Sequence, residues 1–189
     1  MIAGLTSVVS RAHTGICRVG CRVTTVWLLT GCLAVAALRA QQSQELPAAL
    51  AALLPELKAQ INVPILLPSH LPPLAEQTVY AHAKVDADGY TIRLESEPDC
   101  DGANACFLGI LRAKSGGRYS FPQVVKLNES KTARYKRTTC GGSCSEQAIE
   151  WKCKDVLYIA QLNLKTGSEK EARAEMVELA KSAVRGGAR

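Results

Sequence analysis

Hydrophobic positions change their spacing along the chain, from every third or fourth residue near its two ends to every second residue in the middle. In the stretch LPAALAALLPELKAQ, residues 46–60, the leucines fall on one face of a helix. Pro55 predicts that this helix is bent or broken. The stretch that follows, NVPILLPSHLPPL, is rich in proline and favours an extended segment.

A spacing of two residues begins at Val79 and predicts β-strands. Alternating apolar residues on both sides of DADG, residues 86–89, indicate a β-hairpin that extends from Val79 to Leu94. Five further strands are expected between turns rich in glycine, serine and asparagine, and their sequences are ACFLGILRA, QVVKL, ARYKRT, QAIEWKC and DVLYIAQLNL. Strands at this spacing are typical of an antiparallel meander.

The last part of the chain, SEKEARAEMVELAKSAVRGG, predicts an amphipathic helix. Ser168 and Glu171 have the spacing of a capping box at its start, and Gly186 marks its end. Its apolar residues repeat along one face, and they are Ala172, Met176, Leu179, Ala180 and Ala183. We therefore expect an α+β fold: an antiparallel β-meander sheet with an N-terminal helix and a C-terminal helix packed on it.

The 189 residues are enough for one ordinary hydrophobic core. The chain divides into a signal peptide at residues 1–40, an N-terminal helical segment at 41–62 and a single α+β domain at 63–189. The signal peptide is indicated by several arginines, the uncharged run VTTVWLLTGCLAVAAL, and LRA before a series of glutamines. The uncharged run is shorter than the ~20 residues of a typical membrane span.

We therefore expect an exported protein, either periplasmic or secreted. Two alternatives stay open. The stretch LTGC, residues 29–32, has the form of a bacterial lipoprotein cleavage site, at which Cys32 would be lipidated. The second alternative is that the signal segment is retained as a membrane anchor. Membrane association is expected only in these two cases.

The net charge gives little indication of a partner. Four of the 23 basic residues lie in the first forty positions, whereas all 17 acidic residues lie downstream, so the mature chain carries a net charge of only +2. A nucleic acid partner is therefore not expected.

The densest basic cluster of the mature chain lies in KTARYKR, and its cations are Lys131, Arg134, Lys136 and Arg137. Such a patch can bind anionic polymers or lipid head groups. The alternation of charges is also typical of the solvent side of an edge strand, where basic residues discourage aggregation. We favour the edge-strand interpretation and keep an anion-binding patch as the alternative.

No catalytic, cofactor-binding or metal-binding residue can be assigned. The mature chain has two histidines, His70 and His82, and neither lies near a cysteine pair, so a zinc site would have to consist of four cysteine thiolates. Nucleophile elbows of the form GxSxG, phosphate-binding loops and dinucleotide-binding motifs are absent from the sequence. We expect no cofactor and favour a protein that is not an enzyme.

Five cysteines follow the signal peptide, in the stretches CDGANAC and CGGSCSEQAIEWKC. In an exported protein they indicate disulfides rather than zinc ligands. An odd number leaves one cysteine over, and Cys153 is the best candidate because it alternates with Ile149 and Trp151 on one side of a strand. We expect it to be a free, buried thiol. The other four cysteines can pair within each stretch or between the two stretches.

The mature chain resembles a group of short exported bacterial proteins of unknown function, of the cyanobacterial type. The resemblance lies in the order PILLPSHLP, GYTIRLESEPDCDGANACFLG and CGGSCSEQAIEWKCKDVLYIAQL, followed by a helix ending in AKSAV. Trp151, Tyr158 and Ile159 match its last strand pair. The resemblance implies an extracytoplasmic location and two local disulfides, Cys100–Cys106 and Cys140–Cys144. Cys153 is not part of the pattern.

These observations favour a noncatalytic envelope or secreted domain that binds a partner or ligand, and we expect it to be a monomer. One alternative is a small secreted hydrolase, which would need a cleft that joins His70 or His82 to a nucleophile. Another is a carrier of lipid or lipoprotein, which would need an apolar cavity between sheet and helix.

Overall fold

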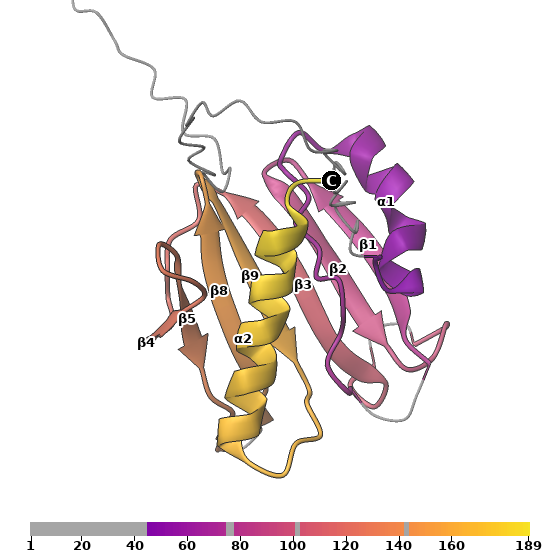
Figure 1. Ribbon diagram of the computed structural model, residues 1–189. Helices are drawn as coiled ribbons and strands as arrows, with labels where there is room; N and C mark the ends of the chain where they lie inside the picture. Colours follow the sequence, from indigo (N-terminus) through magenta and orange to yellow (C-terminus); the bar gives the residue numbers. More distant parts are fainter. Residues whose placement is uncertain (1–44, 75–77, 101–102, 142–143) are drawn as a thin grey trace, which may run out of the picture. The chain divides into compact units, whose positions relative to one another are not determined.

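The computed structural model describes residues 45–74, 78–100, 103–141 and 144–189 (Figure 1). The elements in chain order are α1 (Ala48–Gln60), β1 (Tyr80–Asp86), β2 (Gly89–Glu95), β3 (Phe107–Ser115), β4 (Gln123–Lys126), β5 (Thr132–Lys136), β6 (Thr139–Cys140), β7 (Cys144–Ser145), β8 (Gln147–Cys153), β9 (Val156–Leu162) and α2 (Glu169–Gly186). The expected signal peptide, with Cys32, lies outside the described residues. Within the described part, no helix is both long and apolar enough to cross a membrane.

The main sheet confirms the expected α+β class. Seven antiparallel strands lie in the order β1-β2-β3-β9-β8-β5-β4, and β6 and β7 form a separate small hairpin. The order departs from a simple meander at one place, because β4 does not pair with β3. Residues 116–122, called here the crossing segment, instead carry the chain from β3 to the opposite edge of the sheet. Strand β9 then returns to fill the place between β8 and β3.

One face of the sheet, called here the inner face, holds the hydrophobic core. Because side chains alternate along a strand, the pairing register places most of the apolar residues of the seven strands on this face. The largest of them are Tyr90, Ile92, Leu94, Tyr135, Ile149, Trp151, Tyr158 and Leu162, all buried. Leu50 and Leu57 of α1 and Met176 and Leu179 of α2 belong to the same core. Figure 1 shows both helices over this face.

The extended segment expected from the prolines runs between the two helices. Residues 61–74 form no helix or strand, and two of them, Leu66 and Leu67, are buried. Two tyrosines of the sheet hold this segment. The hydroxyl of Tyr90 donates to Leu66 O at 3.4 Å, and that of Tyr158 donates to Pro64 O at 2.7 Å. The space between the helices is therefore filled by chain.

Both helices lie close to their expected positions. Helix α1 continues through Pro55, so the expected break does not occur. At the start of α2, the hydroxyl of Ser168 accepts a hydrogen bond from Glu171 N at 3.3 Å, as the capping box predicted. The helix ends one residue later than expected, because Gly187 rather than Gly186 takes the left-handed backbone angle, with φ of 69°.

Candidate functional site

The face of the sheet that points away from the helices, called here the outer face, is mainly polar. The strand register places these charged side chains on it: Lys84, Asp86, Arg93, Glu95, Arg112, Lys114, Lys126, Arg134, Lys136, Glu150 and Lys152. The crossing segment passes over it and divides it into two halves, one on β1, β2 and β3 and the other on β8, β5 and β4. A polar sheet face without a second layer is the natural place for a surface that contacts another molecule.

The crossing segment is anchored by Glu150, which is fully buried although it points to the outer side. Its Oε1 accepts hydrogen bonds from Ser120 N at 2.5 Å and from Phe121 N at 2.6 Å. Its Oε2 accepts one from Ser120 Oγ at 3.2 Å. Gly117 lies against Leu157, where an added Cβ would come within 2.7 Å of the leucine Cβ. The carboxylate and the absence of a side chain together hold the segment on the sheet.

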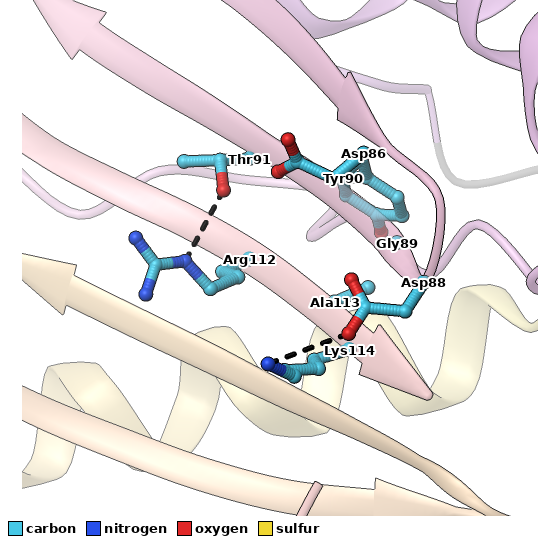
Figure 2. A pocket seen from close by; sticks show the side chains of 8 residues that line it. All are labelled: Asp86, Asp88, Gly89, Tyr90, Thr91, Arg112, Ala113 and Lys114. Atoms are coloured by element: carbon cyan, nitrogen blue, oxygen red, sulfur yellow. Dashed lines mark hydrogen bonds and ion pairs between the residues drawn. The ribbon is translucent and has the colours of Figure 1, made fainter. Parts of the chain in front are cut away.

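A small polar pocket of about 150 Å³ lies in the first half, at the turn between β1 and β2 (Figure 2). Arg112 Nε donates to Thr91 Oγ1 at 3.1 Å, and Lys114 Nζ lies 3.3 Å from Asp88 Oδ2. Lys114 and Asp88 therefore offset each other's charge, whereas Arg112 is hydrogen-bonded to an uncharged hydroxyl. The pocket holds no histidine beside a nucleophile, so it does not have the arrangement of a hydrolase site.

A second polar cluster on the same half surrounds Glu95. This carboxylate is buried, and it accepts a hydrogen bond from Arg93 Nε. His82 Nε2 lies 3.5 Å from Glu95 Oε2, and the imidazole side chain is half exposed. A carboxylate that orients a histidine is part of many catalytic sites. Within the described residues, however, no serine, threonine or cysteine is hydrogen-bonded to His82, so a nucleophile is missing from the arrangement.

The second half of the outer face carries a surface that we call the basic patch, made of Tyr119, Val124, Lys126, Arg134, Lys136 and Lys152. Two cations lie over the ring of Tyr119, with Arg134 Cζ 5.3 Å and Lys152 Nζ 5.4 Å from the ring centroid. Arg134 Nη1 also donates to the carbonyl of Phe121 at 3.3 Å. These contacts fix an aromatic ring and two cations next to each other.

The basic patch corrects and extends the sequence interpretation. Strand β5, which holds Arg134 and Lys136, is not an edge strand. It lies between β8 and β4, and β4 occupies the edge of the sheet. The edge-strand interpretation is therefore wrong. Lys131 lies in the turn before β5, and Arg137 follows the strand. The other members of the patch come from separate parts of the chain, so their grouping with Arg134 is not visible in the sequence.

Few carboxylates offset the charge of the basic patch. Of the outward positions on β4, β5 and β8, the one acidic residue is Glu150, and its oxygens are already used by the crossing segment. Glu129 and Asp155 lie in turns at the margins. The cations of the first half differ, since three of the four, Lys84, Arg93 and Lys114, each form an ion pair, and Arg112 does not.

The basic patch also holds the exposed large apolar side chains of the described residues. Val124 is 59% exposed and Tyr119 is 37% exposed, whereas the other large apolar side chains of the described residues are less exposed. Val124 is the register partner of Arg134, whose guanidinium contacts Tyr119. Exposed apolar groups that gather at one place commonly mark a contact surface.

Four of the five downstream cysteines form two local disulfides. Cys100 is bonded to Cys106, with Cα atoms 6.1 Å apart, and Cys140 to Cys144, with Cα atoms 4.0 Å apart. Cys153 belongs to neither bond and is half-buried, with its side chain toward the core, so it is less covered than expected. Its presence as a thiol stays a prediction. The two disulfides indicate an oxidising, extracytoplasmic environment.

Comparisons with protein-family models, with curated proteins and with solved structures gave no match for this chain. The arrangement of the side chains therefore carries the functional argument. In the described ranges, no three histidine, cysteine, aspartate or glutamate side chains come together as metal ligands would. The basic patch is the candidate functional site, because it combines cations not offset by carboxylates with exposed apolar groups.

Proposed function

We propose that this protein is a noncatalytic exported domain that binds a partner or ligand through the basic patch on its outer sheet face. One observation carries the proposal. Arg134 and Lys152 flank the exposed ring of Tyr119, and the one outward carboxylate of their strands, Glu150, is buried under the crossing segment. Such a surface attracts anionic groups and can also bury apolar area.

Export is supported by three features of the chain. The first forty residues have the composition of a signal peptide. The two disulfides are of the kind that persists in an oxidising compartment. The mature chain also resembles short exported bacterial proteins, as its motif order and local cysteine pairs indicate. We place the protein in a periplasm or outside the cell.

Two alternative functions receive less support. A lipid carrier would need a cavity between sheet and helices, but residues 61–74 fill this region and Leu66 and Leu67 are buried there. A hydrolase would need a nucleophile beside a histidine, and the cluster around His82 holds a carboxylate and a guanidinium instead. Both arrangements favour a binding role over catalysis.

The proposal is tested by retention of envelope components on the immobilised protein, prepared in a host that exports it. The variant R134E/K152E reverses the two cations at Tyr119. The matched control K58E/K170E makes the same change of charge on exposed positions of α1 and α2, across the sheet. We expect a reproducible ligand that the control retains and R134E/K152E loses. Equal retention by all three proteins would contradict the proposal.

A further inference from the structure

We infer that the ligand of the basic patch is an anionic lipid surface, on which the protein docks with strands β4, β5 and β8 toward the head groups. This inference rests on the proposed function, since it names the chemistry of the partner that the patch binds. It differs from the sequence-based expectation, in which membrane association depended on lipidated Cys32 or on a retained signal segment.

The first argument is that charge and apolar exposure coincide. A soluble polyanion is attracted by cations alone and gains nothing from an exposed aliphatic side chain. Val124, 59% exposed, and Tyr119, 37% exposed, lie among the cations. A membrane interface takes both kinds of group, because tyrosine rings settle at head-group depth and basic residues pair with anionic head groups.

The second argument is that the cations lie on adjacent strands and point the same way. Lys126, Arg134 and Lys152 come from β4, β5 and β8, which are neighbours at a spacing of about 4.8 Å. Lys136 lies on β5, two residues beyond Arg134 and on the same face. One surface can therefore contact all four cations at once.

The third argument is that the rest of the outer face lacks this excess of charge. Lys84 lies 3.9 Å from Asp86 Oδ1, and Lys114 lies 3.3 Å from Asp88 Oδ2. Three of the four cations of this half thus have a carboxylate partner and only Arg112 does not, so its excess of positive charge is smaller than that of the basic patch. The attraction is therefore directional. Strands β4, β5 and β8 face the lipid, and the pocket of Figure 2 lies outside the contact surface.

The experiment measures partition of the full chain, purified from an exporting host, onto sedimenting vesicles. One set of vesicles is phosphatidylcholine alone, and the other contains phosphatidylglycerol. The main variant is K126E/K136E, because among the described residues neither lysine makes an ion pair that its loss would break. The control is again K58E/K170E. The variant Y119S/V124S removes the apolar groups and leaves the charges unchanged.

We expect binding to the anionic vesicles only. Each basic residue near an anionic surface contributes a factor of roughly five, so K126E/K136E should lower the partition coefficient at least about 25-fold. The control should lower it less than about threefold, since its residues lie across the sheet. Y119S/V124S should weaken vesicle binding several-fold and leave binding to soluble polyphosphate unchanged.

Three results would overturn the inference. The first is the absence of binding to phosphatidylglycerol vesicles. If R134E/K152E still lost an envelope component in the retention experiment, the proposed function would stand and only the lipid assignment would fail. The second is an equal loss in K58E/K170E, which would indicate net charge alone. The third is vesicle binding that Y119S/V124S does not weaken, which would indicate a general polyanion site. Failure of both the vesicle and the retention experiments would reject the proposed function as well.

Discussion

The hydroxyl of Tyr158 donates a hydrogen bond of 2.7 Å to the carbonyl oxygen of Pro64, which lies 94 residues earlier in the chain. Residues 61–74 are rich in proline and cannot pair as a regular strand, so the sheet supplies part of their hydrogen bonding through side chains. Tyr90 does the same for Leu66. Two phenol groups thus help to hold the segment that covers the core between the helices.

The substitution Y158F should lower the free energy of unfolding by about 1 kcal/mol, because it removes a largely buried hydrogen bond without removing the ring. Urea denaturation measures this change. Y135F is the matched control: the hydroxyl of Tyr135 has no hydrogen-bond partner among the described residues, although the carboxylate of Glu169 lies nearby. Burial raises the pKa of Tyr135, and Y135F should be neutral or stabilising. Equal destabilisation by both variants would contradict this assignment.

The substitution E150A should destabilise the protein by about 3 kcal/mol, because it leaves the N–H groups of Ser120 and Phe121 without their acceptor. Hydrogen exchange at these two amides should accelerate more than exchange in β9. E129A, at an exposed turn, should change stability by less than about 0.5 kcal/mol. Unchanged exchange at both amides in E150A would show that other contacts hold the crossing segment.

The substitution G89A should destabilise the protein by more than about 2 kcal/mol, because strand β3 approaches Gly89 too closely for a side chain. An added Cβ would collide with the carbonyl oxygen of Ala113 and lie 2.8 Å from its carbon. A Cβ added at Gly141 would meet no atom within 4 Å, so G141A serves as the control. Thermal unfolding compares the two variants. A stable G89A would mean that the hairpin shifts its register at little cost.

Patterns of neighbouring residues were sufficient to predict the helices and strands. The order of the strands in the sheet depends on contacts between distant residues, which the sequence does not show. The strand QAIEWKC follows from the alternation of its residues, and the cap at Ser168 follows from a hydrogen bond to Glu171, three residues later. The sequence therefore predicted both correctly. The path of the crossing segment depends on contacts with Glu150 and Leu157, which follow it in the chain. A stretch such as GGRYSFP indicates a loop, but nothing in it indicates which strands it crosses.

The basic patch was only half predictable for the same reason. Arg134 and Lys136 lie in one dense cluster of charges, which is visible in the sequence. Tyr119 and Lys152 become neighbours of Arg134 only through the register of β5 with β8 and the path of the crossing segment. The role of Glu150 was equally hidden, because a carboxylate in a strand is usually solvated.

Stability should fall in mild acid partly through Glu178. Lys181 Nζ donates to its carboxylate at 2.6 Å, and this bond lowers the pKa of Glu178. A lowered folded-state pKa contributes stability above the unfolded value of about 4.3, and this contribution is lost as the pH falls through the folded value. The side chain is 47% exposed, so the effect is less than about 1 kcal/mol. E178Q should flatten the stability curve between about pH 3 and pH 5, as denaturation at each pH would measure; an unchanged curve would contradict it.

Reduction of the two disulfides should cost modest stability, because each closes a short loop. The chain-entropy estimate for loops of this size is about 2 kcal/mol each. Nonreducing peptide mapping checks the pairing and the state of Cys153 together. Because Cys153 is half-buried, we expect it to react with a thiol reagent more slowly in the folded protein than in the unfolded one. A crosslink that includes Cys153, or one between the two cysteine stretches, would contradict the assignment.

The insertion of β9 between β3 and β8 has a consequence for the timing of folding. In the seven-stranded sheet, β9 is the strand that bonds to both halves, and it is also the last strand in the chain. An incomplete chain can form the hairpins of each half, but it cannot join them. The halves therefore become one cooperative unit only after Val156–Leu162 is available, which keeps a growing chain from closing its sheet early.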